Sequence, residues 1–366
     1  TVRNILAAFD AEAAVRWFAS LGVALKAEPT GKLFPTTNRA ATVLNALVGR
    51  ATSLGVEIRA GCRVGDVAVV EGAAPSFLLT HSHGRLLAHR VVLATGGRSL
   101  PRTGSDGGGW TIAERLGHTV TPTFPALVPL VLDPAFWHAE LSGVAHPAEL
   151  STVSDGKVVD RRSGSLLWTH FGVSGPLVLD ASRHWLAAEG RSRRMPTSTS
   201  AAHASAVELR CSVLPGRDAP GADAWLLDIA RRAGGRPVGA VLGETLPDRL
   251  ARTLCRHAGV DVSMRLSELA RADRRALAAA LGALPLPVVG DRGWDFAEVT
   301  AGGVPLAEID HRTMGSRRAP GLHLVGEMLD VDGRIGGFNF HWAWVTGYLA
   351  GRGVIASARG VLPSPS

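Results

Sequence analysis

A length of 366 residues, of which 46% are apolar and 19% charged, is typical of a soluble globular protein with enough chain for one large domain or two ordinary ones. The formal net charge is +7, yet only Lys26, Lys32 and Lys157 are lysines and the arginines are scattered without interleaved aromatic residues, so no nucleic-acid partner is expected. No apolar run approaches the roughly 20 residues that span a bilayer, and no charged-then-apolar signal opens the chain, so no membrane partner is expected.

The three cysteines, Cys62, Cys211 and Cys255, are far apart, and none belongs to a CxxC pair. This spacing excludes a disulfide framework and a zinc site, so no metal is predicted. The cysteine usage fits a reducing cytoplasm, where we expect the protein to reside. The sequence leaves the oligomeric state open.

The first region, residues 1–120, is predicted to contain helices followed by a small meander of strands. Apolar residues at helical spacing mark one helix around Val15, Phe18 and Leu21, and a second helix over residues 41–55. Short strands follow over 66–70, 76–82 and 86–94, with turns at 72–75 and 83–84.

The middle region, residues 121–295, is predicted to be an inserted domain of strands and helices. Four prolines between residues 122 and 134 break regular structure, and short strands are expected within 126–132 and 164–170. A helix is predicted over 175–188, a loop without periodicity over 195–206, and three helices between about 222 and 284.

The last region, residues 296–366, returns to α/β character. Strands are predicted over 296–304 and 321–327, and an almost wholly apolar helix over 338–351. Since a parallel sheet binds ligands outside the carboxyl ends of its strands, the turns after 91–94, 297–300 and 322–325 are the expected ligand sites.

The first and last of these turns carry candidate cofactor residues. Thr95, Gly96 and Gly97 let the backbone leave a buried strand without a side chain in the way, so that a flat cofactor could pass close; the alternative is a plain tight turn. Gly326 permits a similar approach, and Glu327 could accept hydrogen bonds from sugar-like hydroxyls. The alternative for Glu327 is an exposed acid at a strand end.

A second glycine pair, Gly336 and Gly337, precedes the apolar helix. These residues allow the backbone to press against a ligand, and Asn339 is predicted to cap the helix. The free amides and partial positive charge of the helix N-terminus would stabilise the negative charge of a reduced flavin. Phe338 belongs to this candidate contact, although core packing is the main role expected for the four aromatic residues Phe338, Phe340, Trp342 and Trp344.

These motifs together resemble the bacterial flavoprotein family that includes bile-acid-inducible enone reductases and aminoacetone oxidases. Matching segments cover 31–47, 93–130, 166–176, 291–304 and 320–344. The resemblance implies an α/β fold in which a Rossmann-like FAD-binding domain is interrupted by an inserted β-barrel-like plus helical domain. It also implies FAD held between the turns at 94–97 and 336–339, adenine beside the backbone near Val64, a small-molecule substrate, and NAD(P)H as a candidate electron donor.

The chain departs from the family pattern in two places. The family opens with a strand, a GxGxxG turn and a helix, which this sequence lacks, and His341 stands where most relatives are expected to have glutamine. We therefore expect segment 321–327 to have unpaired strand edges and the 366 residues alone to bind FAD poorly.

The candidate catalytic residues are His170 and Arg334. His170 lies in a loop with Gly172 and Gly175 that could face a flavin; alternatively, it bonds locally and Ser174 caps a helix. Arg334 could bind an anionic substrate or the flavin, or could be a solvated arginine. The sequence predicts a flavin-dependent oxidoreductase of the reductase or oxidase type. The alternatives are a non-catalytic flavin- or partner-binding protein, an inactive fragment of the enzyme and a nucleic-acid-modifying flavoprotein.

Overall fold

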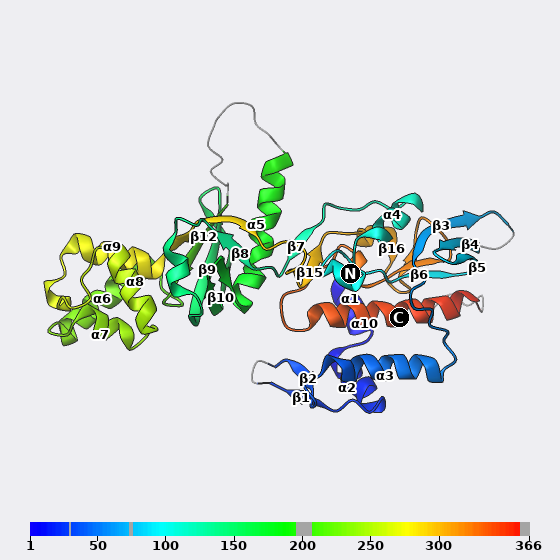
Figure 1. Ribbon diagram of the computed structural model, residues 1–366, viewed down its shortest axis with the longest axis horizontal. Helices are drawn as coiled ribbons and strands as arrows, with labels where there is room; N and C mark the ends of the chain where they lie inside the picture. Colours follow the sequence, from blue (N-terminus) through cyan, green and yellow to red (C-terminus); the bar gives the residue numbers. More distant parts are fainter. Residues whose placement is uncertain (29–30, 73–75, 195–206, 359–366) are drawn as a thin grey trace. The chain divides into compact units, whose positions relative to one another are not determined.

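The computed structural model describes residues 1–28, 31–72, 76–194 and 207–358. The loop predicted over 195–206 and most of the turn predicted over 72–75 lie outside these residues. The chain divides into two compact units (Figure 1): unit 1 comprises Thr1–Thr123 and Val299–Ser366, and unit 2 comprises Phe124–Glu298.

A four-stranded sheet forms the centre of unit 1. Its strands lie in the order β16 (Ile309–Asp310), β17 (Gly315–Ser316), β18 (Leu322–Leu324) and β6 (Val91–Leu93), and β18 and β6 are parallel. Leu322 and Leu324 are fully buried. The prediction that segment 321–327 has unpaired edges is wrong, because β17 and β6 flank β18.

The predicted meander is present as an antiparallel sheet of β3 (Val64–Val70), β4 (Ser76–His81) and β5 (Gly84–Ala88). The single strand expected over 86–94 is divided, because β5 ends at Ala88 and β6 belongs to the four-stranded sheet. There the Val91 N–H donates to the Gly321 carbonyl, so the chain changes partners within three residues.

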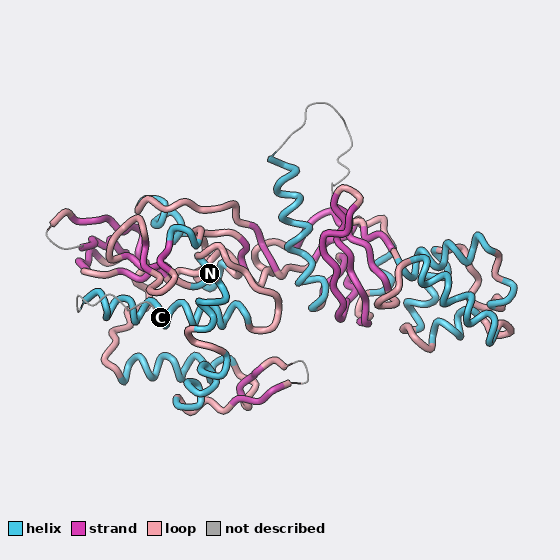
Figure 2. Tube along the Cα trace, turned by 180° about the vertical axis from the view of Figure 1, so that it is seen from behind, coloured by secondary structure: helices cyan, strands magenta, loops and turns pink. Residues whose placement is uncertain are grey.

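Helices and a small hairpin complete unit 1. In Figures 1 and 2, α10 (Phe338–Ala358) lies between the sheets and the group formed by α2, α3 and the β1–β2 hairpin. Within the described ranges, no helix is long and apolar enough to cross a membrane. The remaining elements are α1 (Val2–Ala7), α2 (Ala11–Ser20), β1 (Leu25–Ala27), β2 (Leu33–Pro35), α3 (Ala40–Ser53), η1 (Pro101–Thr103), α4 (Gly108–Arg115), β15 (Val299–Ala301), η4 (Leu306–Glu308) and η5 (Gly326–Met328).

Unit 2 is built on a seven-stranded sheet with the order β13-β12-β9-β10-β11-β8-β14. β13 and β14 are consecutive pieces of one extended segment, and they pair with β12 and β8, so this segment joins both edges of the sheet. The closure confirms the barrel-like insertion. The strands are β7 (Phe124–Ala126), β8 (Leu130–Leu132), β9 (Ala145–Ser154), β10 (Lys157–Thr169), β11 (Gly172–Ser174), β12 (Val207–Ser212), β13 (Leu284–Leu286) and β14 (Val288–Asp291).

The helical part of unit 2 forms a separate group beside the barrel-like sheet (Figure 2). Four α-helices stand where three were predicted, because Pro237 and Pro247 immediately precede α7 and α8 and divide the helical stretch. The group contains α6 (Ala219–Ala233), α7 (Val238–Gly243), α8 (Asp248–His257), η3 (Leu266–Glu268) and α9 (Arg271–Gly282), whereas α5 (Pro176–Arg194) packs against the sheet and η2 (Trp137–Leu141) precedes β9.

A buried polar network joins the segment after α4 to the β16–β17 edge of unit 1. Glu308 accepts hydrogen bonds from His118 Nδ1 (2.8 Å), from the Thr119 N–H (3.1 Å) and hydroxyl (2.9 Å), and from Arg318 (3.3 Å). Burial by itself raises the pKa of Glu308, but these hydrogen bonds outweigh it and hold the pKa below its usual value.

Replacing Glu308 with alanine should lower the free energy of unfolding by about 3 kcal/mol at neutral pH, because His118 and Thr119 then lose a buried acceptor. Since the folded pKa of Glu308 is lowered, its stabilising contribution is present above the unfolded pKa and disappears as pH falls through the folded pKa. The difference from wild type should therefore shrink in acid, measured as the urea midpoint across pH. Glu114→Ala, at an exposed position on α4, is the control. A difference independent of pH would contradict the assignment.

Candidate functional site

Three strand-end turns of unit 1 meet at Thr300, which is fully buried in β15. The prediction that this strand belongs to the same sheet as β6 and β18 is wrong, because β15 lies in a separate two-stranded sheet. Its hydroxyl oxygen accepts hydrogen bonds from the backbone N–H groups of Arg98 (2.8 Å) and Ser99 (3.2 Å), which follow β6. Its own N–H donates to Glu327 Oε1 (2.8 Å), which follows β18. The hydrogen bonds of Thr300 therefore join the turns after β6 and β18, which the sequence predicted as separate candidate ligand sites.

Gly96 and Gly97 are needed for packing within this network. A Cβ on Gly97 would overlap the side chains of Thr300 and Glu327, and a Cβ on Gly96, where φ is +74°, would lie 2.7 Å from Ser105 Oγ. Thr95 is exposed, with its hydroxyl 3.7 Å from Met328 Sδ. The protein therefore has internal reasons for both glycines, and the contact of residues 95–97 with a cofactor stays a prediction.

Glu327 is half-buried, so the alternative of an exposed acid at the strand end is wrong. Burial raises the pKa of Glu327, and the hydrogen bonds from Thr300 offset only part of this effect. The carboxylate therefore occupies a partly desolvated position at the carboxyl end of the parallel strands, where a ligand hydroxyl would find a strong acceptor.

The loop between Gly326 and α10 is anchored on the helix at two points. The Gly326 N–H donates to Thr346 Oγ1 (2.9 Å), and Trp342 Nε1 donates to the Gly326 carbonyl (3.0 Å). Asn339 accepts from the Gly333 N–H (2.7 Å) and donates to its carbonyl (3.1 Å). The prediction that Asn339 caps the helix is wrong, because Asn339 lies inside α10 and its amide holds the preceding loop.

Gly336 and Gly337 have φ values of +127° and +91°, which favour glycine. A Cβ on Gly337 would find no atom of the described residues within 4 Å, so this exposed position faces open space. Phe338 and Phe340 are 43% and 69% exposed, so the expectation of core packing is wrong for them, whereas Trp342 is only 4% exposed and confirms it. An exposed turn with aromatic side chains beside it is suited to a flat ligand.

Val64, the first residue of β3, is linked to the turn at 95–97 by a chain of contacts. The neighbouring Arg63 forms an ion pair with Asp106 (2.5 Å), which lowers the pKa of Asp106. Gly107, the residue after Asp106, continues the link, because its N–H donates to the Gly97 carbonyl (3.1 Å). The predicted contact between Val64 and adenine remains untested by this geometry.

The two candidate catalytic residues belong to different units. His170 of unit 2 is exposed between β10 and β11, and its ring meets Phe171 edge-on at 5.2 Å. A Cβ on the adjoining Gly172 would overlap the Leu130 carbonyl, so that glycine serves strand packing. Arg334 of unit 1 is exposed, with its guanidinium 4.9 Å from the centre of the Phe338 ring.

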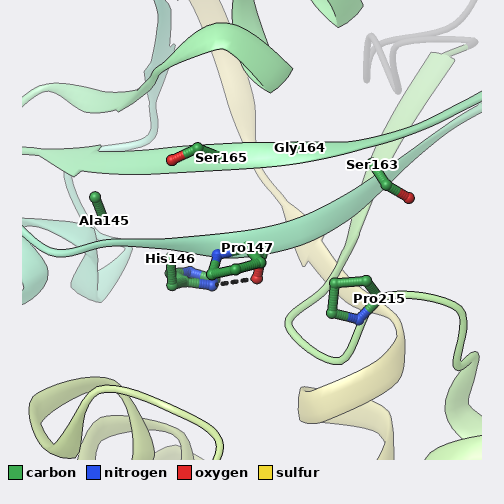
Figure 3. Close-up of a pocket in the computed structure, with 7 residues that line it drawn as sticks. All are labelled: Ala145, His146, Pro147, Ser163, Gly164, Ser165 and Pro215. Atoms are coloured by element: carbon green, nitrogen blue, oxygen red, sulfur yellow. Dashed lines mark hydrogen bonds between the residues drawn. The ribbon is translucent and has the colours of Figure 1, made fainter. Parts of the chain in front are cut away.

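A cavity of about 470 Å³ in unit 2 contains none of the predicted site residues (Figure 3). Its one ionisable lining residue is His146, whose Nδ1 donates to the Pro147 carbonyl (2.8 Å) and whose Nε2 accepts from Trp168 Nε1 (3.0 Å). Burial lowers the pKa of His146, and the two hydrogen bonds occupy both ring nitrogens. The cavity therefore offers no acid–base group. Its lining residues are Ala145, His146, Pro147, Ser163, Gly164, Ser165 and Pro215.

The structure also brings together three residues that the sequence analysis did not connect. Cys62, His81 and His83 each place one potential ligand atom within 4.8 Å of the others. A zinc site was excluded because no cysteines have CxxC spacing, but that rule does not consider one cysteine with histidines from a hairpin turn. The His-x-His pattern at 81–83 was the available signal.

Comparisons with known proteins identify the family. The HI0933-like protein Rossmann domain matches residues 1–353. The chain is 32% identical over 350 residues to the 3-dehydro-bile acid delta(4,6)-reductase of Clostridium scindens, covering 96% of this chain and 81% of the reductase. It is also 32% identical over 338 residues to the ribosomal RNA dihydrouridine synthase of Escherichia coli, covering 92% and 77%.

Among solved structures, the open conformation of a flavocytochrome c3 fumarate reductase matches 94% of this chain and 62% of its own, with 15% identity and a TM-score of 0.41, too low for further inference. The family match and the two curated relatives confirm the resemblance to bile-acid reductases seen in the sequence motifs. The chain therefore belongs to the HI0933-like family of Rossmann-domain proteins, with the α/β fold class predicted from its sequence.

Proposed function

We propose that the protein is an FAD-dependent oxidoreductase that uses NAD(P)H to saturate a carbon–carbon double bond in a small molecule. The observation that carries the proposal is the meeting of three strand-end turns at Thr300, in a chain whose relatives are named as a reductase and a dihydrouridine synthase. Both names describe the saturation of a carbon–carbon double bond, which requires a hydride and a proton.

Two features of unit 1 fit FAD. The carboxyl ends of β6 and β18 are adjacent, as in folds that bind dinucleotides at this edge. Gly337 combines a positive φ with open space where a side chain would point, which leaves room for a flat ring against the backbone. FAD, when bound, supplies the hydride-transfer chemistry that no amino-acid side chain provides.

The chain's own residues would bind and orient the cofactor. The amides in the first turn of α10 have no partner one turn earlier within the helix, so they are donors for an anionic ring edge, and the helix dipole adds positive potential. Glu327 is the acceptor for a ligand hydroxyl. Trp342 and Thr346 hold the Gly326 backbone in place, which fixes the turn that carries Glu327.

A second candidate function is the reduction of a base in RNA, favoured by the name of the Escherichia coli relative and by the net charge of +7. The small-molecule function is preferred because the arginines form no stripe interleaved with aromatic residues. Binding of a ribosomal RNA fragment, measured by fluorescence anisotropy at increasing salt, separates the two. Steeply salt-dependent, tight binding would favour RNA.

The proposed function is tested with the FAD-loaded protein under anaerobic conditions. NADPH or NADH should bleach the flavin absorbance, and an α,β-unsaturated ketone such as cyclohexenone should restore it with formation of the saturated ketone. A flavin that stays oxidised with both nucleotides would favour the non-catalytic flavin-binding alternative. Restoration by a ribosomal RNA fragment but by no enone would favour the second candidate.

For His170→Ala, we expect reoxidation of the reduced flavin by cyclohexenone to slow by about 100-fold, while bleaching by NAD(P)H keeps its wild-type rate. The reason is that a positioned imidazole supplies the proton or polarises the carbonyl only in the substrate half-reaction. The two rates are measured separately by stopped-flow absorbance. His89→Ala, at an exposed position after β5, is the control. An unchanged reoxidation rate would leave His170 with only its local contact to Phe171.

A further inference from the structure

Cys62, His81 and His83 form a compact group of metal-type ligands at the start of the β3–β4–β5 sheet. Cys62 Sγ lies 3.1 Å from His81 Nδ1, and the three candidate ligand atoms all lie within 4.8 Å of one another. Cys62 and His81 are half-buried and His83 is exposed, so the group is accessible from solvent on one side. Val64, the residue predicted to lie beside adenine, pairs with His81, so the group adjoins the predicted adenine contact.

The backbone holds these ligands together. His81 ends β4 and pairs with Gly84 of β5, so His83 lies in a two-residue hairpin turn. Within that turn, Ser82 donates from its N–H to the Arg63 carbonyl (2.9 Å) and accepts at its hydroxyl from the Arg63 N–H (3.2 Å). The turn is therefore fixed to Arg63, the residue next to Cys62. Backbone hydrogen bonds, and not flexible side chains alone, keep the three ligands close together.

The protonation pattern also suits a metal. The backbone N–H of His83 donates to His81 Nδ1 (3.2 Å), so this nitrogen carries no proton, and a metal would bind its lone pair in place of this contact. The thiol of Cys62 must then be the donor in its own contact with Nδ1. A divalent ion would replace the thiol proton, which is released to solvent, and would bind the thiolate and the imidazole lone pair that now face each other.

We propose that Cys62, His81 and His83 bind a divalent transition-metal ion, with Zn²⁺ as the best match and water as the fourth ligand. One sulfur and two nitrogen donors are the set that Zn²⁺ prefers. Zinc–ligand bonds of about 2.0–2.3 Å in a tetrahedron place neighbouring ligand atoms about 3.5 Å apart. The Cys62–His81 distance of 3.1 Å is close to that value, and the two distances to His83 do not exceed 4.8 Å.

Cobalt provides the first test, because a cobalt–thiolate bond has an intense near-ultraviolet charge-transfer band. The full chain, freed of metal with EDTA under reducing conditions, should develop this band with one equivalent of Co²⁺ and lose it when Zn²⁺ is added. Cys62→Ser should abolish the band, and His81→Gln or His83→Gln should weaken Co²⁺ binding at least about 10-fold. His89→Gln, at the far end of β5, should bind as wild type does.

A second measurement does not depend on the variants. Zn²⁺ should protect Cys62 from alkylation by iodoacetamide, with the labelled peptide identified by mass spectrometry; Cys211 and Cys255 are buried in unit 2 and serve as internal references. Absence of the cobalt band in the wild type, its persistence in Cys62→Ser, or equal alkylation of Cys62 with and without Zn²⁺ would each overturn the proposal. If the proposal is overturned, the contact between Cys62 and His81 is only a hydrogen bond between a thiol and an imidazole.

Discussion

Replacing Gly97 with alanine is expected to lower the free energy of unfolding by about 2–3 kcal/mol. The added methyl group would lie 2.7 Å from Thr300 Cβ and close to Glu327 Oε1. Thr300 cannot turn away without releasing the backbone N–H groups of Arg98 and Ser99, which its hydroxyl holds. Gly97 does not have a positive φ, so the loss would come from packing and not from backbone strain.

The matched control is Gly49→Ala in α3, where the new Cβ would find no atom within 4 Å and the backbone is helical. There alanine should stabilise the helix by up to about 1 kcal/mol. Both variants are compared with wild type by the midpoint of urea unfolding, followed by circular dichroism. A Gly97→Ala protein with an unchanged midpoint would mean that the turns after β6, β15 and β18 are not packed as closely as Thr300 indicates.

The three turns could be predicted from the sequence because each is a local pattern, an apolar strand followed by glycine or by an acid. What joins them could not be predicted. Thr300 reaches Arg98 across 202 positions of the chain and Glu327 across 27, and nothing local to a threonine in a strand indicates such partners. Hydrophobic periodicity predicts where a strand ends. The side chain that joins the strand-end turns depends on the positions of the strands relative to one another, which periodicity does not give.

The errors near α10 have the same origin. Asn339 before an apolar helix matches a capping pattern, but the helix begins one residue earlier and the amide bonds to Gly333 instead. Phe338 and Phe340 read as core residues because they are large and apolar, yet they are exposed, since residues 338 and 340 precede the part of α10 that packs on the loop at Gly326. The sequence predicts the start of the helix at residue 338 correctly, so these errors concern which side chains pack and not where the helix begins.

The Cys62–His81–His83 group shows what spacing rules miss. Each ligand is unremarkable alone, and the separation of 19 residues between Cys62 and His81 matches no metal-binding motif. The meander returns the chain to its starting point, because β4 runs antiparallel to β3 and ends opposite Val64. Residues at the start of one strand and the end of the next are therefore neighbours, which strand prediction with correct pairing would have indicated.

Gly337→Val is expected to weaken FAD binding by about 10- to 100-fold, because the side chain would occupy the open space assigned to the flavin ring. The corresponding steric cost is about 1–3 kcal/mol, and 1.4 kcal/mol is a factor of ten in affinity. Among the residues that the structure describes, no atom lies within 4 Å of the new Cβ, so the Cβ itself meets nothing in the protein. Affinity is measured by FAD titration with fluorescence detection, alongside the flavin absorbance of the purified protein.

Backbone strain is the competing cause, since φ at Gly337 is +91° and a non-glycine residue there costs about 1–2 kcal/mol. Gly337→Ala separates the two causes, because alanine carries most of the strain and little of the bulk. Gly347→Ala, at an exposed position within α10 where the Cβ meets nothing, is the control that should bind FAD normally. If alanine and valine weaken FAD equally, strain explains the loss. If valine binds FAD as tightly as wild type, the flavin does not lie against Gly337, and the assignment of this turn to the cofactor is wrong.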